Sequence, residues 1–221
     1  MNKWITRFRQ RLAPHFHKKE IFISPERKFV SFTFDDVPRS AFDYAVPAMK
    51  KYNVRGTFYV VLSMMEGVSG EKAIYGAEDL KKALSAGNEL GCHTFGHIRF
   101  HQAGDVDFIE KDLIRNQSVL NENGIAQDLR NFSYPFGEQT VKSRKILTRR
   151  FLSSRGIKPG INAGKTDLNN LKAIKLYEGH HPIGNIHRMI EDFDQQGGWL
   201  IFYTHDIQAD YSEFGCSEAY F

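Results

Sequence analysis

Short apolar segments that suit β-strands alternate with longer segments of helical periodicity from residue 28 to residue 203. The strand candidates are rich in Phe, Val and other residues that favour strands. The helix candidates repeat their apolar residues at intervals of three and four. The predicted strands cover residues 28–34, 56–62, 89–93, 131–134, 151–154, 171–176 and 199–203. The predicted helices cover residues 40–52, 77–86, 105–123, 141–150 and 184–196. This alternation predicts an α/β fold with a mostly parallel sheet or barrel.

The basic residues are concentrated at the beginning of the chain. Residues 1–19 hold six of them and no acidic residue, so the rest of the chain, with 24 basic and 26 acidic residues, is close to neutral. We therefore predict a basic arm over residues 1–22 and a single folded domain over residues 23–221. A near-neutral body argues against a nucleic-acid-binding surface, so no nucleic-acid partner is expected.

Three structures are open to the arm. In a helix, one side would carry the apolar residues Trp4, Ile5, Phe8 and Leu12, and such a helix can rest on an anionic membrane surface. The alternatives are an arm that packs on the domain or one that has no fixed structure. Because the arm lacks the apolar run of a secretory signal or a membrane span, we expect a cytoplasmic protein, and a helical arm would add peripheral contact with the inner membrane surface. The two cysteines predict no disulfide framework, which agrees with a reducing compartment.

Titratable side chains stand just after several predicted strands. Asp35 and Asp36 follow the first strand, His93 and His97 lie at the end of the third, and His205 follows the last. Ligand sites of α/β folds form at the carboxyl ends of strands. These side chains are therefore the first candidates for a functional site.

The Asp-Asp pair and the two histidines suit a metal site. Adjacent carboxylates repel each other unless a cation neutralises one or both, or one is protonated. Neighbouring residues of an extended chain point in different directions, so one carboxylate can bind a metal while the other faces elsewhere. Two histidines and a carboxylate supply three ligands and leave room for water. Taken alone, the Asp-Asp pair would also fit a plain exit from a strand into a loop.

In their order along the chain, these motifs resemble those of the polysaccharide deacetylase family, the NodB-homology carbohydrate esterases. The resemblance extends over roughly residues 28–215 and is carried by the segments Thr33–Asp36, His93–His97, Tyr134–Gly137 and Leu200–His205. It implies a distorted (β/α) barrel of mostly parallel strands and a catalytic domain of this type over residues 23–221.

The resemblance also implies a role for each matching residue. The residues that would bind a divalent metal, most often Zn2+, are Asp36, His93 and His97. Asp35 would be the catalytic base and His205 the catalytic acid, and the backbone N–H of Phe136 would stabilise the oxyanion.

The sequence departs from the family pattern at two places. The family usually has an Arg that pairs with the catalytic Asp where this chain has Ser133. We expect Arg155 to replace it, lying against Asp35 and tuning that base, with Arg130 as the less favoured alternative. Relatives commonly continue beyond the last histidine through a further helix and strand, so a barrel that is incomplete at its C-terminal end is the second expectation.

The resulting hypothesis is a metal-dependent hydrolase that removes an N- or O-linked acetyl group from a sugar of a glycan or glycan precursor. The expected partner is thus an acetylated carbohydrate. One alternative is a deformylase or amidase that acts on a lipid-linked amino sugar. The other is a carbohydrate-binding relative without catalysis, which the missing Arg at position 133 and the early C-terminus would favour.

Overall fold

The computed structural model describes residues 10–69 and 72–221 and contains one strongly curved parallel sheet. Its seven strands follow the order β10-β11-β2-β3-β6-β7-β8, and every neighbouring pair is parallel. The strands are β2 (Lys28–Asp35), β3 (Gly56–Val60), β6 (Glu89–Cys92), β7 (Asn131–Ser133), β8 (Ser153–Arg155), β10 (Ile174–Lys175) and β11 (Gly198–Thr204).

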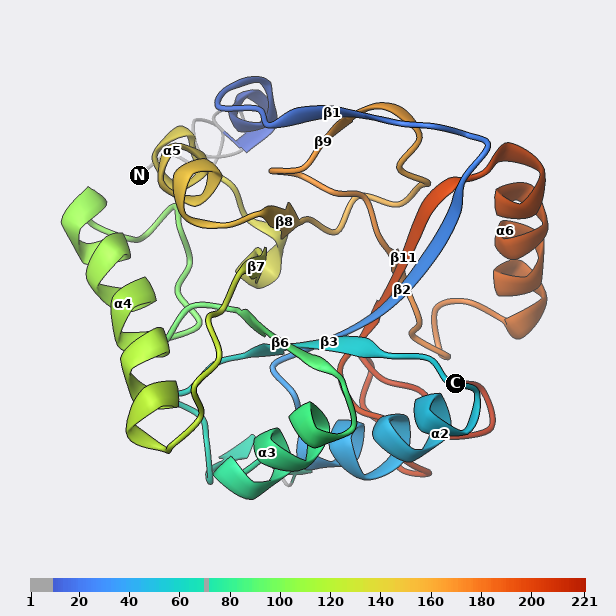
Figure 1. Ribbon diagram of the computed structural model, residues 1–221, viewed down its shortest axis with the longest axis horizontal. Helices are drawn as coiled ribbons and strands as arrows, with labels where there is room; N and C mark the ends of the chain where they lie inside the picture. The colour runs from blue at the N-terminus through green and yellow to red at the C-terminus, as the bar shows by residue number, and fades with distance from the viewer. Residues whose placement is uncertain (1–9, 70–71) are drawn as a thin grey trace.

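Within the part of the chain that the structure describes, the helices α2 to α6 surround the curled sheet (Figure 1). They are α2 (Val46–Lys51), α3 (Ala77–Ser85), α4 (Val106–Glu122), α5 (Val141–Arg150) and α6 (Ile183–Gln196). Figure 1 shows α2 and α3 below the sheet, α4 and α5 on the left and α6 on the right. The predicted fold class, a distorted (β/α) barrel of mostly parallel strands, is therefore confirmed.

An aromatic stack anchors the strand that leads into the Asp-Asp pair. Phe34 of β2 is paired in register with Phe58 of β3, and their ring centroids are 4.5 Å apart. Phe42 stacks on the other side of Phe58 at 4.6 Å. Phe34 and Phe58 are fully buried, and burying a large side chain stabilises a fold by about 1.5–3 kcal/mol. The end of β2 is thus held in a fixed position.

The first predicted helix differs in form from the expectation. Its first part, Ala41–Ala45, is a π-helix, and α2 begins only at Val46. Pro47 stands in the first turn of α2 and not within a continuous helix. A proline is tolerated there because the backbone N–H that it lacks has no partner within the helix.

Several short elements were not foreseen. Strand β1 (Glu20–Ile23) pairs antiparallel with β9 (Gly164–Asp167), and the two run together along the top of Figure 1. A small hairpin, β4 (Val68–Ser69) and β5 (Lys72–Ala73), interrupts a segment predicted as loop. Three-residue 3-10 turns occur at Ala13–His15 (η1) and Pro135–Gly137 (η3).

Part of the predicted basic arm lies against the body. Ala13 is fully buried, and β1 is tied to β9 by its register. Residues 1–9, which include most of the predicted amphipathic helix, lie outside the described residues. The boundary at residue 22 stays a prediction. Among the described helices, each is too short or too polar to serve as a membrane span.

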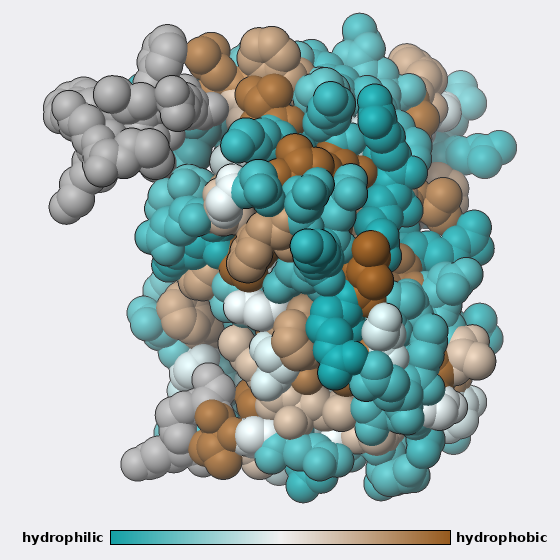
Figure 2. Space-filling view, turned by 90° about the vertical axis from the view of Figure 1, so that its left-hand side faces the viewer, coloured by the Kyte–Doolittle hydropathy of each residue, from teal (hydrophilic) through white to brown (hydrophobic). Residues whose placement is uncertain are grey.

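The face that carries α4 and α5 is mostly hydrophilic (Figure 2). Its apolar side chains are scattered in small patches, and Phe108 and Ile114 of α4 are among the exposed ones. Scattered apolar residues are normal on a protein surface.

Candidate active site

The three predicted metal ligands lie together at the carboxyl ends of β2 and β6. Oδ1 of Asp36 is 3.5 Å from Nε2 of His93 and 3.2 Å from Nε2 of His97. One potential ligand atom from each residue lies within 4.8 Å of the other two. We call these three residues the Asp36–His93–His97 cluster.

Unusual backbone conformations bring the cluster together. Asp36 has a φ of 55°, which turns the chain sharply at the end of β2. In the loop after β6, Thr94 and His97 have φ values of 65° and 47°. Non-glycine residues rarely adopt this left-handed region, and each such residue costs of order 1–3 kcal/mol. The surrounding fold must therefore stabilise these turns.

The hydrogen bond of His93 determines which of its nitrogens faces the cluster. Its Nδ1 lies 2.8 Å from the carbonyl oxygen of Ser133. A carbonyl can only accept, so Nδ1 must carry the hydrogen, and Nε2 presents a lone pair to Asp36. Burial lowers the pKa of His93 to about 3, so the ring is neutral. Metal-binding histidines use this arrangement.

The buried oxygen Oδ1 of Asp36 indicates whether the Asp36–His93–His97 cluster suits a metal ion. Oδ1 is buried and has no hydrogen-bond partner among the described residues. Burial is also the main cause that raises the pKa of Asp36 to about 6. An unpaired buried acceptor costs about 1–3 kcal/mol, so a carboxylate oxygen facing two imidazole nitrogens calls for a cation. Two imidazoles and one carboxylate are a donor set used for catalytic zinc, and the cluster fits a divalent metal.

The neighbouring carboxylate, Asp35, faces Arg155. Nη2 of Arg155 donates to both carboxylate oxygens of Asp35 and, at 2.5 Å, to Oγ of Ser133. All three side chains are buried. The predicted contact of Arg155 with Asp35 is therefore present, whereas the side chain of the alternative, Arg130, is exposed.

The pKa values of the two adjacent carboxyl groups move in opposite directions. Burial raises the pKa of Asp35, but the positive charge and the hydrogen bond of Arg155 outweigh this effect and bring the value down to about 2. Asp35 is thus an ionised carboxylate at neutral pH. Adjacent acidic groups in such different environments are typical of sites where the two have different tasks.

His205 lies on the other side of Asp36. Its Nε2 is 3.7 Å from Oδ2 of Asp36, and its Nδ1 is 3.3 Å from the hydroxyl of Tyr177. Sequence reasoning missed Tyr177. A signal did exist, since Tyr177 comes directly after a predicted strand. The register of β10 and β11 pairs Lys175 with Tyr203. Tyr177 and His205 each come two residues later, so they lie beside each other.

Phe136 occupies the turn after β7. It has a φ of 57°, and its ring centroid is 4.4 Å from that of His97. The guanidinium of Arg99 lies 3.6 Å from the centre of the same ring. Arg99 is held in turn by Glu138, which also binds His101. The structure therefore places Phe136 at the rim of the Asp36–His93–His97 cluster, while the role of its amide stays a prediction.

The sequence of this region matches a known family. The family model of polysaccharide deacetylases covers residues 23–150, which include Asp35, Asp36 and the whole cluster. The chain belongs to the polysaccharide deacetylase family. Arg155, Tyr177 and His205 lie beyond the matched residues, so their places in the site rest on the geometry described above.

Two named deacetylases match parts of this family member. The peptidoglycan-N-acetylmuramic acid deacetylase PdaC of Bacillus subtilis (strain 168) is 34% identical over 80 residues, which are 36% of this chain and 15% of that protein. A bifunctional xylanase/deacetylase of Pseudobutyrivibrio xylanivorans is 26% identical over 116 residues, which are 50% of this chain and 17% of that protein. The chain thus covers a small part of the length of either relative.

Solved structures share the fold. The deacetylase PplD of Streptococcus pyogenes, in complex with acetate, has a TM-score of 0.61 and 23% identity over 71% of this chain and 68% of its own. A CE4 family pseudoenzyme of Bacillus anthracis has a TM-score of 0.57 and 16% identity over 83% of this chain and 57% of its own. At these identities the likeness concerns the fold alone, and the chemistry must be argued from this chain's own residues.

Proposed function

We propose that this protein is a metal-dependent hydrolase that removes an acetyl group from a sugar of a glycan or glycan precursor. The observation that carries the proposal is the convergence of two carboxyl groups in different environments and three imidazoles at one end of the barrel. Asp35 is held ionised by Arg155, while Asp36 faces His93, His97 and His205. A site that served binding alone would not need this combination.

Asp35 serves as the general base. A base must be ionised before it can take a proton, and the Arg155 guanidinium keeps Asp35 in that state. Asp35 removes the proton from the water that attacks the acetyl carbonyl. A divalent ion held by Asp36, His93 and His97 would polarise that carbonyl and make the water more acidic. The backbone N–H of Phe136 donates to the developing oxyanion.

His205 serves as the general acid. Its ring lies between Asp36 and the hydroxyl of Tyr177, and part of its side chain is exposed to solvent. It can therefore reach a leaving group that enters from outside. An amine is a poor leaving group unless it is protonated, so an N-acetyl substrate depends on this proton more than an ester does.

A panel of acylated sugars tests the proposal. Purified protein is incubated with N-acetylated, O-acetylated and N-formylated amino sugars, with and without a chelator, and the released acid is measured. Acetate release that the chelator stops supports the proposal. Formate release without acetate release points to a deformylase, and glycan binding without any release points to a non-catalytic relative.

Zinc is expected to raise the thermal midpoint of the wild-type protein and to have little effect on His97→Ala. A ligand that binds the folded state alone stabilises it by about 2.7 kcal/mol at a concentration 100 times its dissociation constant. His101→Ala is the matched control, because His101 binds Glu138 and lies outside the cluster. Equal shifts in wild type and His97→Ala, measured by thermal denaturation, would contradict the metal assignment.

Tyr177→Phe is expected to lower turnover of an N-acetyl sugar up to about tenfold, since one hydrogen bond contributes about 0.5–1.5 kcal/mol. The tyrosine hydroxyl fixes the orientation of His205 through Nδ1. Hydrolysis of p-nitrophenyl acetate should fall much less, because nitrophenolate leaves without an acid. Equal losses on both substrates would show that Tyr177 has a general structural role instead.

A further inference from the structure

The loop that carries two of the cluster residues is held from outside by one acidic side chain. We call residues 93–97 the histidine loop. The half-buried carboxylate of Asp112, on α4, accepts from the backbone N–H of Phe95 at 2.7 Å and from that of Gly96 at 3.0 Å. Each N–H is bound by a different carboxylate oxygen, and hydrogen bonds to an ionised group are about twice as strong as those between neutral groups. Both N–H groups lie between the two histidines, so Asp112 acts on the segment that sets their separation.

The histidine loop has a conformation that most residues avoid. Thr94 and His97 both have positive φ values, 65° and 47°, in the region that non-glycine residues rarely adopt. Such a conformation persists only where the surrounding structure holds it. Oγ1 of Thr94 accepts from the N–H of Ile98 at 3.1 Å, which fixes the end of the loop. The hydrogen bonds of Asp112 fix its middle.

A second side chain of α4 ties the helix to the backbone beside His93. Asn116 is fully buried one turn after Asp112, and its Nδ2 donates to the carbonyl oxygen of Val60 at 3.0 Å. The N–H of His93 donates to the same carbonyl oxygen at 3.1 Å. Oδ1 of Asn116 accepts from the N–H of Leu62 at 3.0 Å. The helix therefore has a fixed position relative to His93, and Asp112 extends this position to the rest of the loop.

The contact between α4 and the histidine loop is close. A Cβ atom at Gly96 would lie 3.2 Å from Oδ2 of Asp112, so the glycine lets the backbone approach the carboxylate. The guanidinium of Arg115 lies 5.7 Å from the centre of the Phe95 ring. Both middle residues of the loop thus contact the helix.

We propose that Asp112 is a positioning residue for the metal ion, which holds the histidine loop so that its two histidines face Asp36 before any metal binds. The inference rests on the proposed function, since it concerns the metal assigned to the Asp36–His93–His97 cluster. When a site is formed in only a fraction of the molecules, its apparent affinity falls in proportion to that fraction. Loss of the Asp112 carboxylate should therefore weaken metal binding although every ligand is still present.

Asp112→Asn tests the positioning role. The variant keeps the size of the side chain but replaces one acceptor oxygen with an NH2 group, which cannot accept from a backbone N–H. Zinc affinity of the metal-free proteins is measured by competition with a fluorescent chelator. We expect zinc to bind Asp112→Asn about tenfold more weakly than wild type, the lower end of the range of about 10–100-fold for residues that hold metal ligands in place.

Two different outcomes would contradict this inference, and they are distinguishable. Equal zinc affinity in wild type and Asp112→Asn would overturn the positioning role and leave the metal assignment intact. A wild-type protein that binds no zinc would contradict the metal assignment and the positioning role with it. If Asp112→Asn does not fold, Gly96→Ala replaces it with the same expected direction, because the added Cβ displaces the carboxylate.

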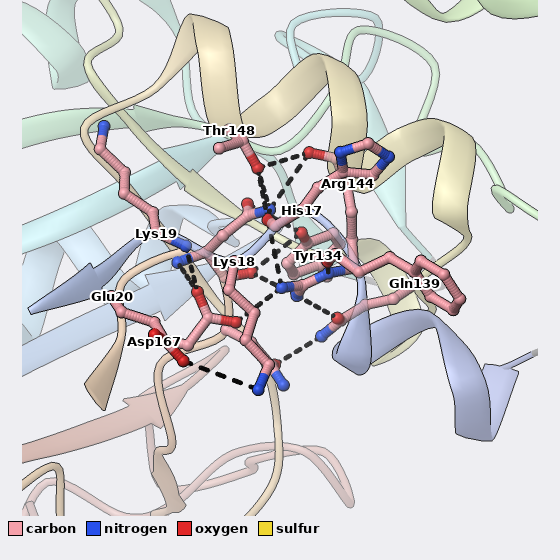
Figure 3. A network of polar contacts seen from close by, with 12 residues as sticks. His17, Lys18, Lys19, Glu20, Tyr134, Gln139, Arg144, Thr148 and Asp167 are labelled. Carbon is pink, nitrogen blue, oxygen red and sulfur yellow. Dashed lines mark hydrogen bonds and ion pairs between the residues drawn. The ribbon is translucent and has the colours of Figure 1, made fainter. Parts of the chain in front are cut away.

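Asp167→Asn is the matched control for a general loss of stability. Figure 3 shows Asp167 beside Lys19 and Arg144. Its carboxylate accepts from the N–H of Lys19 at 2.8 Å and pairs with the buried Arg144 at 2.6 Å, and neither residue belongs to the histidine loop. Asp167→Asn should therefore lower the free energy of unfolding, measured in urea, and leave zinc affinity unchanged. Equal weakening of zinc binding in both variants would show that Asp112 has only a general structural role.

Hydrogen exchange tests the loop without any metal. In the zinc-free wild type, the amide hydrogens of Phe95 and Gly96 should be protected, because both are bound by Asp112. In zinc-free Asp112→Asn they should exchange about tenfold faster. Equal exchange rates in the two proteins, measured by NMR, would overturn the claim that Asp112 forms the site before the metal arrives.

Discussion

Asp35→Asn is expected to lower deacetylation by about 10²–10⁴-fold, the usual contribution of a positioned general base, while the bound metal remains. An amide cannot take the proton from the attacking water. The metal should remain because Asp35 faces Arg155 and Ser133, whereas the carboxylate of Asp36 faces the histidines. The measurement combines acetate release with metal analysis of the purified variant.

Asp36→Asn is the matched control for this result. It changes the neighbouring carboxylate by the same one-atom substitution and should remove both metal and activity. The assignment of the two roles would be wrong if Asp35→Asn lost its metal, or if Asp36→Asn kept both metal and turnover.

Arg155→Met is expected to destabilise the protein by about 3–5 kcal/mol, the cost of removing one partner of a buried ion pair. Both side chains are almost fully buried, at 1% and 6% exposure, so Asp35 would be left as an unpaired charge. Burial would then raise the pKa of Asp35 and favour its protonated form, so activity should fall as well. Urea denaturation and acetate release measure the two effects.

Adding Ser133→Arg to Arg155→Met tests whether the arginine acts through Asp35. Oγ of Ser133 lies 2.5 Å from Nη2 of Arg155, which also contacts Asp35. The side chain of an arginine at position 133 would therefore start close to the carboxylate of Asp35. We expect the double variant to recover part of the lost stability and turnover. The positioning role of Arg155 would be contradicted if Arg155→Met kept wild-type stability and activity.

The strands that carry the site were predictable because they are rich in aromatic and β-branched residues. β3 and β11 lie in the middle of the parallel sheet, are buried along most of their length and appear in the sequence as short apolar runs, whereas β2 has Phe or Val at four of its eight positions and is buried at its carboxyl end. The convergence of Asp36, His93 and His97 was predictable for a related reason. Parallel strands bring their carboxyl ends to one edge, so titratable residues after different strands become neighbours.

Other features depended on contacts that no local pattern records. The polar strand β9 exists because β1 pairs with it, and a segment such as Gly164–Asp167 has little strand preference of its own. The π-helical turn before α2 and the place of Tyr177 beside His205 likewise follow from packing and register. Sequence reasoning left all three out.

The amino-acid sequence by itself determined the alternation of strands and helices and the identity of the groups at the strand ends, since both depend on residue type and spacing along the chain. The tertiary structure decided that Arg155 rather than Arg130 reaches Asp35, a partner 120 positions away. It also decided that Asp167 binds the backbone N–H of Lys19, 148 positions earlier in the chain. The physical reason is that these contacts join residues far apart in the chain, and only the folded sheet brings such residues within hydrogen-bonding or packing distance.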